Sequence, residues 1–111
     1  MKQLIDMTNG AVLLQSVETA DTFFTRLRGL QFRSSLPRDG GLLLSPCSSL
    51  HTCFMRFPID VIMLDADNIV LGHRRNLKPW RMFLCEKHTT SVIETQVDAL
   101  AEMAGKHVTL R

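Results

Sequence analysis

The run IDVIML at residues 59–64 constrains the fold of this chain more than any other stretch. All of its residues except Asp60 are apolar, so a strand here would be apolar on both faces. Pro58 lies directly before the run and cannot donate a hydrogen bond to a strand ladder, and the short polar residues at 65–68 are typical of a turn. The run therefore predicts a central strand that other parts of the chain cover on both faces.

Other apolar stretches between turn signals predict further strands. The Asn9-Gly10 pair between two apolar runs is typical of a tight hairpin turn, because both central positions of that turn favour positive φ. It predicts strands at about 2–7 and 11–17. Further strands are expected at about 41–45, 50–57, 69–74, 82–85, 91–94 and 107–110.

Two segments carry apolar residues at the spacing of one helix face. The first predicts a helix at about 20–29, and the second predicts a helix at about 96–104 with Gly105 at the position of a closing glycine. We therefore predict an α+β, β-dominated chain: a compact antiparallel sandwich or partly closed barrel with two short helices, in one domain spanning 1–111. The apolar positions are Phe23, Leu27 and Leu30 in the first segment and Val97, Leu100, Ala101 and Ala104 in the second.

The composition narrows the class of protein. With 111 residues and a net charge of +2, the chain lacks the strong charge that would by itself predict a nucleic-acid or membrane partner. No run approaches the ~20 apolar residues of a membrane helix, and the N-terminus lacks the apolar core of a secretory signal. The odd number of cysteines, three, is typical of free thiols in a reducing compartment. We therefore expect a cytoplasmic protein without membrane insertion.

Three blocks of the sequence resemble one known family. They are RLRGLQFRSSLPRDGGLLL at 26–44, HTCFMRFPIDVIMLD at 51–65, and VIE with a following helix and strand at 92–110. On these blocks the chain resembles, over nearly its whole length, the bacterial and archaeal family catalogued as domain of unknown function 192. The middle block is the most specific. Its matching positions are Phe54-Met55, Pro58-Ile59-Asp60 and Leu64-Asp65, with Pro46-Cys47 and Pro79-Trp80-Arg81 indicating a subgroup.

The resemblance implies a fold but no agreed activity. Similar proteins are compact β-sandwich or barrel domains with one or two helices, and some short ones are encoded near pilus and secretion machinery, which makes such a component one candidate partner. The chain departs from the family at Gln31, where a methionine is usual, and at Val97-Asp98, where Ala-Gly is usual. The second departure weakens what the family implies about the C-terminal helix.

Asp60 is the charged residue whose position most requires a partner. It stands at the head of the apolar run, and an unpaired buried charge costs several kcal/mol. We expect an ion pair with Arg28 or Arg56. Such a pair either only joins the first helix to the sheet or belongs to a functional site.

Cysteine and histidine are spaced as C-x3-H-x-C at 47–53 and C-x2-H at 85–88. Neither spacing matches a zinc ribbon or finger, so we predict no metal and no cofactor. A thiolate activated by His51 would require a turn at Ser48-Ser49, because side chains four residues apart in a strand are ~13 Å apart. We predict packing roles for the three cysteines, which are Cys47, Cys53 and Cys85.

Three functions fit these features, and we favour the first, because the sequence contains no recognisable catalytic set. The first is a non-catalytic domain that binds a small anionic or polar ligand or a protein partner. The second is a small enzyme that acts by acid–base chemistry on a sugar-like or other polar molecule, with His51 and Asp60 in one concave pocket. The third is nucleic-acid binding through the basic run HRRNLKPWR at 73–81, with an affinity that falls with salt. The residues assigned to the binding surface of the first function are Arg28, His51, Arg56, Asp60, Trp80 and Arg81.

Overall fold

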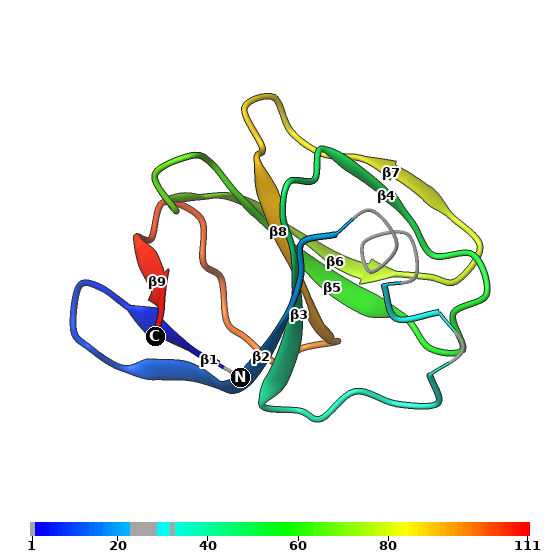
Figure 1. The fold of residues 1–111 in the computed structure, drawn as a ribbon, viewed down its shortest axis with the longest axis horizontal. Coiled ribbons are helices and arrows are strands. Elements are labelled where there is room, and N and C mark those ends of the chain that lie inside the picture. The colour runs from blue at the N-terminus through cyan, green and yellow to red at the C-terminus, as the bar shows by residue number, and fades with distance from the viewer. Residues whose placement is uncertain (1, 23–28, 32) are drawn as a thin grey trace.

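The computed structural model describes residues 2–22, 29–31 and 33–111, which form nine strands and no helix within those ranges (Figure 1). The chain is therefore β-dominated, as the sequence predicts. The strands are β1 Lys2–Asp6, β2 Val12–Ala20, β3 Gly40–Leu44, β4 Ser49–His51, β5 Ile59–Leu64, β6 Val70–Leu77, β7 Met82–Leu84, β8 Ser91–Gln96 and β9 Val108–Leu110.

The strands form two sheets. Seven strands build a large sheet in the order β6-β5-β8-β3-β2-β1-β9, and β4 and β7 build a separate two-stranded sheet. Neighbours are antiparallel except for β2 and β3, which run parallel. The predicted Asn-Gly hairpin is confirmed, since Gly10 has a φ of 74° and its N–H donates to the Asp6 carbonyl at 2.8 Å.

The large sheet curls until its outer strands approach each other at one end. Figure 1 shows β9 beside the segment that leads into β6. A bridge joins Ile69 to His107, the Val70 N–H donates to the Lys106 carbonyl at 2.8 Å, and the Val108 N–H donates at 3.1 Å to the carbonyl of Asn68. The fold is thus a partly closed barrel, one of the two architectures that the sequence predicts, but the prediction of a wholly antiparallel sheet is wrong at the β2–β3 pair.

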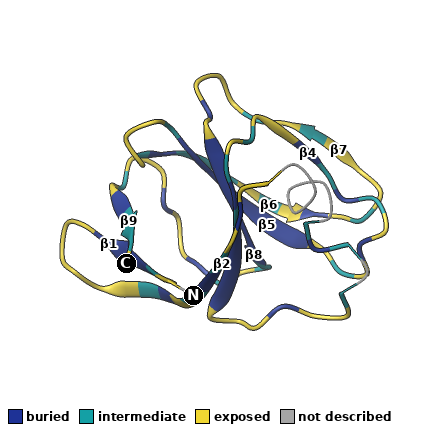
Figure 2. Cartoon of the chain, in the orientation of Figure 1, coloured by how far each residue is buried: buried dark blue, intermediate teal, exposed yellow. Residues whose placement is uncertain are grey.

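β5 is the central strand that the apolar run predicts. It lies between β6 and β8, and all six of its residues are buried. Figure 2 shows β5 as buried along its whole length, and β8 is buried except for its last residue, Gln96. Ile59, Val61 and Met63 face one core cluster, which also contains Leu50 of β4, whereas Ile62 and Leu64 face a second cluster with Leu100 and Met103. The small sheet therefore covers the first face of β5, and the 97–104 segment covers the second.

The helix predicted at 96–104 is wrong. After β8 ends, the segment continues in turns and irregular backbone. Asp98 has a φ of 62° and donates its N–H to Asp60 Oδ2 at 2.9 Å, and Arg75 Nη1 donates to the Leu100 carbonyl at 3.2 Å. The Asp60 carboxylate and the Arg75 guanidinium therefore hold backbone groups of this segment in tertiary hydrogen bonds, and the helical spacing reflects only that Leu100 and Met103 both face the core.

The helix predicted at about 20–29 is wrong at residue 20, which belongs to a strand, and Gly29 lies in a turn. Ala20 is the last residue of β2, because the parallel pairing with β3 extends this strand as far as the Ala20–Leu44 pair. Residues 23–28, which would form most of the helix, lie outside the described residues. Within the described ranges, no helix is long and apolar enough to cross a membrane.

Candidate functional site

The outer face of the small sheet is apolar and exposed. In its register Ser49 lies opposite Leu84, Leu50 opposite Phe83, and His51 opposite Met82. Leu50 and Phe83 pack against the first core cluster, so Met82 and Leu84 point the other way, with 74% and 79% of their surface exposed. Side-chain alternation thus places two large aliphatic groups in solvent.

Two aromatic rings extend this apolar face. Phe54 and Trp80 are 50% and 58% exposed, and their ring centroids lie 4.8 Å apart with planes tilted by 59°. Of the six large hydrophobic residues that are exposed in the described part of the chain, these two and Met82 and Leu84 account for four. We call these four residues (Phe54, Trp80, Met82 and Leu84) the apolar patch.

Both aromatic residues of the apolar patch have a strained backbone. Phe54 has a φ of 63° and Trp80 a φ of 64°, a region that bulky side chains rarely adopt. Each such position costs about 1–3 kcal/mol and persists only where surrounding contacts enforce it. The strand predicted at 50–57 therefore ends at His51, and the chain turns to present Phe54 beside Trp80.

Hydrogen bonds of the buried residue Thr52 hold the Phe54 and Trp80 loops in this arrangement. Its side chain is fully buried, and its Oγ1 donates to the Lys78 carbonyl at 2.6 Å and accepts from the Arg81 N–H at 2.9 Å. Its backbone N–H donates to the Arg81 carbonyl at 2.9 Å, and its carbonyl accepts from the Trp80 N–H at 3.0 Å. One buried threonine thus joins the loop that carries Phe54 to the loop that carries Trp80.

Exposed cations adjoin residues of the apolar patch in the chain or lie beside the small sheet. Arg81 lies between Trp80 and Met82 in the chain, and the Arg74 guanidinium lies 5.9 Å from the centroid of the Phe83 ring. Arg and Lys at such positions can hold an anionic group next to an apolar contact. We call these exposed cations the cationic rim; they are Arg56, Arg74, Lys78 and Arg81.

Four of the predicted site residues belong to this surface or adjoin it in the chain. Trp80 belongs to the apolar patch, Arg56 and Arg81 belong to the cationic rim, and His51 is the cross-strand partner of Met82. The half-buried His51 ring accepts the Cys53 N–H at Nδ1 over 3.2 Å. The fifth residue, Arg28, lies outside the described residues.

Asp60, the sixth, does not line this surface. Its side chain has no exposed area, and it accepts the backbone N–H of Asn76 at 2.8 Å and that of Asp98 at 2.9 Å. Arg75 Nη1 lies 3.4 Å from Asp60 Oδ2, and His73 Nε2 lies 3.6 Å from it. Asp60 therefore fastens β6 and the segment after β8 to β5.

Among the described residues Asp60 forms its arginine ion pair with Arg75 and not with Arg56, while the predicted alternative, Arg28, lies outside them. The described part of the chain contains no ion pair between Asp60 and Arg56, while Arg75 fills that role from β6. A register irregularity between the Ile59 and Val61 pairings lies opposite Arg75 and Asn76, so local sequence did not reveal this contact. Asp60 and His51 also lie on opposite sides of β5, and they do not form the acid–base pocket that the enzyme hypothesis requires.

The basic run 73–81 is divided between two environments. The His73 side chain is 1% exposed, and burial lowers its pKa, with the Arg75 charge adding to the effect. Arg75 is held by Asp60 and the Leu100 carbonyl, while Arg74, Lys78 and Arg81 are exposed. The run therefore does not present all its cations to one nucleic-acid backbone.

Glu94 is a buried acid that sequence reasoning missed. It lies in the middle of β8 opposite Leu42 and Val61, and only 2% of its surface is exposed. Burial raises the pKa of Glu94 to about 8, against a smaller opposing effect of Arg33. Its Oε1 has no hydrogen-bond partner among the described residues. The signal in the sequence was an acid inside the otherwise apolar strand that begins SVIE.

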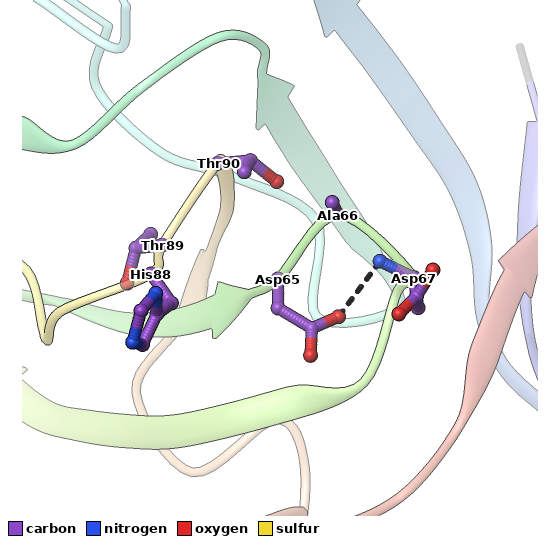
Figure 3. Close-up of a pocket in the computed structure, with 6 residues that line it drawn as sticks. All are labelled: Asp65, Ala66, Asp67, His88, Thr89 and Thr90. Carbon is purple, nitrogen blue, oxygen red and sulfur yellow. Dashed lines mark hydrogen bonds between the residues drawn. The ribbon is translucent and has the colours of Figure 1, made fainter.

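A hollow of about 380 Å³ opens between the turn after β5 and the segment before β8 (Figure 3). Asp65 Oδ1 is used within the turn, where it accepts the N–H groups of Asp67 at 2.8 Å and Ile69 at 3.0 Å. Figure 3 shows His88 and Asp67 on opposite sides of Asp65. The hollow is therefore explained by turn structure, as predicted for these aspartates. Its lining is Asp65, Ala66, Asp67, His88, Thr89 and Thr90.

The three cysteines are half-buried and form no disulfide among the described residues, and Cys47 and Cys85 pack against the first core cluster. Burial and the neighbouring Cys47 raise the pKa of Cys85 to about 11, which disfavours the reactive thiolate. No three His, Cys, Asp or Glu side chains converge as metal ligands within residues 2–22, 29–31 and 33–111.

Comparison with known proteins supports the resemblance found in the sequence. A model of the family described as "Uncharacterized ACR", domain of unknown function 192, matches residues 5–108. A UPF0127 protein of Thermococcus sibiricus is 35% identical over 105 residues, which span 87% of this chain and 65% of that protein. A UPF0127 protein of Pyrococcus furiosus is 32% identical over 96 residues, which span 82% of this chain and 80% of that protein. The chain thus spans slightly less than two thirds of the first relative.

A solved structure has the same fold. It is a protein of unknown function from Novosphingobium aromaticivorans, with a TM-score of 0.79 and 20% identity over 97% of this chain and 82% of that chain. At this identity the likeness concerns the fold alone.

Proposed function

This chain belongs to the family described as "Uncharacterized ACR", and for this member we propose a non-catalytic function: binding of an anionic partner through the apolar patch and the cationic rim. The partner is a small anionic ligand or a protein segment, and a pilus or secretion component is one candidate. The proposal keeps His51, Arg56, Trp80 and Arg81 from the sequence analysis.

The observation that supports the proposal is the strained, exposed pair Phe54 and Trp80. Folding gains little from two rings that remain half in water, yet the backbone adopts an unfavourable φ at both. Thr52 fixes both loops before any partner arrives, so binding would require little further ordering. Tryptophan and arginine are also the side chains that most often dominate binding energy at interfaces.

The chemistry of the surface favours an anion with an apolar portion. Burying a large aliphatic or aromatic side chain contributes about 1.5–3 kcal/mol, and Met82 and Leu84 have most of their surface available for it. A guanidinium such as that of Arg81 can bind a carboxylate through two parallel hydrogen bonds. Apolar contact would therefore supply affinity, and the cationic rim would select negative charge.

A fluorescence experiment tests the surface. The probe is 8-anilinonaphthalene-1-sulfonate, which combines aromatic rings with one negative charge, and Trp80 is the only tryptophan that can transfer energy to it. We expect Met82→Ser with Leu84→Ser to abolish this transfer. The matched control is Met7→Ser with Val12→Ser, which removes the other two exposed hydrophobic residues of the described chain and should leave the transfer unchanged.

A thermal-shift panel tests the function itself. Organic acids, acidic peptides and their neutral and basic counterparts are added to the protein and to a Trp80→Ala, Arg81→Gln variant. Because a ligand that binds only the folded state raises Tm, acidic compounds should raise Tm of the unsubstituted protein alone. Equal shifts in both proteins, or a preference for neutral compounds, would contradict the proposal.

A further inference from the structure

β7 has an unpaired edge next to the apolar patch. The Cys85 N–H donates to the Ser48 carbonyl at 3.1 Å, and the Thr52 N–H donates to the Arg81 carbonyl at 2.9 Å. In an antiparallel ladder these pairs alternate with pairs whose backbone groups point outward. The outward positions of β7 are therefore Met82 and Leu84.

The backbone N–H and C=O groups of Met82 and Leu84 are available to another strand. The small sheet contains only β4 and β7, and no hydrogen bond involves either residue on the outer side among the described residues. Proteins usually protect such an edge with a charge on the strand, a proline or a covering segment. Here the two strand positions are aliphatic, and their side chains are the most exposed of the apolar patch.

We propose that β7 binds an extended acidic peptide segment as an added strand, an inference that rests on the proposed function and specifies its partner. Added strands gain affinity from main-chain hydrogen bonds and specificity from alternate side chains. Alternate apolar residues of the segment would lie beside Met82 and Leu84, and its acidic residues would meet the cationic rim. A small ligand could use the rim, but it could not satisfy a row of backbone groups.

Charge complementarity favours an acidic segment over a second copy of this chain. The segments next to β7 in the chain carry the exposed cations Lys78, Arg81 and Lys87 and one exposed acid, Glu86. A second copy would bring the same excess of positive charge to the contact, whereas acidic residues would neutralise it. A single-stranded nucleic acid would supply negative charge but not the backbone groups of a strand.

The test compares three labelled nine-residue peptides by fluorescence anisotropy. The first alternates valine and glutamate, the second is the same peptide with N-methyl groups on alternate amides, and the third has lysine in place of glutamate. We expect the first to bind, and the second and third to bind at least tenfold more weakly. Hydrogen exchange at the Met82 and Leu84 amides should slow only with the first peptide.

A proline variant tests the backbone groups of the β7 edge separately from the side chains of the apolar patch. Leu84→Pro removes an N–H that points away from β4, which an edge strand tolerates, and Leu84→Thr keeps that N–H with a side chain suited to a strand. Urea unfolding checks that both variants fold. Leu84→Pro should lose binding of the first peptide at least tenfold more than Leu84→Thr does.

The outcomes distinguish the inference from the proposed function. Equal binding of the methylated peptide, with unchanged exchange at Met82 and Leu84, overturns the added strand but leaves anion binding by the surface intact. Failure of all acidic compounds, including those of the thermal-shift panel, overturns both. A dimer with slow exchange at these amides without peptide, or binding of a fifteen-nucleotide oligo(dT) that outcompetes the peptide, also overturns the inference.

Discussion

Glu94→Gln is expected to stabilise the protein at neutral pH, although it replaces a fully buried residue of the central sheet. Glu94 is 2% exposed, burial raises its pKa to about 8, and its Oε1 lacks a hydrogen-bond partner among the described residues. The nearby cation, Arg33, is bound to Glu18 at 2.7 Å. The folded protein therefore holds a proton on Glu94 at pH 7.

The sign and size of the effect follow from proton linkage. The pKa of Glu94 lies near 4.5 in the unfolded chain and is raised to about 8 in the folded one. Between these values the folded state binds one proton more, so the free energy of unfolding falls by about 1.4 kcal/mol per pH unit as pH rises. From pH 4.5 to 7 this amounts to about 3 kcal/mol. Glutamine does not titrate, so Glu94→Gln should gain about 1–3 kcal/mol at pH 7, where the lower value allows for burial of the amide.

The assay is urea unfolding followed by Trp80 fluorescence at several pH values from 4.5 to 8. The quantity of interest is the difference in the free energy of unfolding between Glu94→Gln and the unsubstituted protein, which should widen as pH rises. His73 has a lowered pKa and makes stability fall as pH drops below about 6.5, but it is present in both proteins and cancels in the difference. The control Glu86→Gln, at an exposed position, should show a flat difference. A flat difference for Glu94→Gln as well would refute the reasoning.

Three further predictions concern the other buried polar groups and the patch. Thr52→Val should lower the free energy of unfolding by about 1–3 kcal/mol in urea unfolding, since it leaves the Lys78 carbonyl and the Arg81 N–H without their partner. It should also weaken energy transfer from Trp80 to the sulfonate probe, which fluorescence measures. Asp60→Asn should cost about 2–4 kcal/mol in urea unfolding, because the amide cannot serve two N–H groups and a guanidinium as the carboxylate does, whereas Asp98→Asn at a 76% exposed side chain should change stability little. Phe54→Gly should keep or raise stability by up to about 2 kcal/mol as the positive φ is relieved, yet reduce probe binding. A loss of stability would argue against strain at this residue, and unchanged probe binding would argue against its part in the apolar patch.

The parts of the fold that local sequence determines were predicted correctly. An apolar run with polar turns at its end requires a covered strand, and β5 is that strand. The Asn-Gly pair predicted a hairpin, which is confirmed with a positive φ at Gly10, although Asn9 lacks the positive φ expected at both positions. The helix prediction at 96–104 failed because the backbone of this segment forms hydrogen bonds with Asp60 and Arg75, which are distant in sequence.

The candidate surface was predicted only in part, since it depends on strand register. Trp80 and Arg81 were identified because an aromatic residue among cations is visible in the sequence. Met82 and Leu84 were not, because an apolar strand is expected to be buried, and only the pairing of Phe83 with Leu50 reveals which side faces the core. The partner of Asp60 was missed for the same reason.

The most buried strands and the proposed binding surface belong to different sheets. The buried strands β5 and β8 belong to the seven-stranded sheet, whereas the apolar patch lies on and beside the outer side of the two-stranded sheet. The small sheet is attached through inward side chains such as Leu50 and through the hydrogen bonds of Thr52. Substitutions at Met82 and Leu84 therefore remove contacts with solvent and not with the core, so a loss of binding in those variants measures the surface itself.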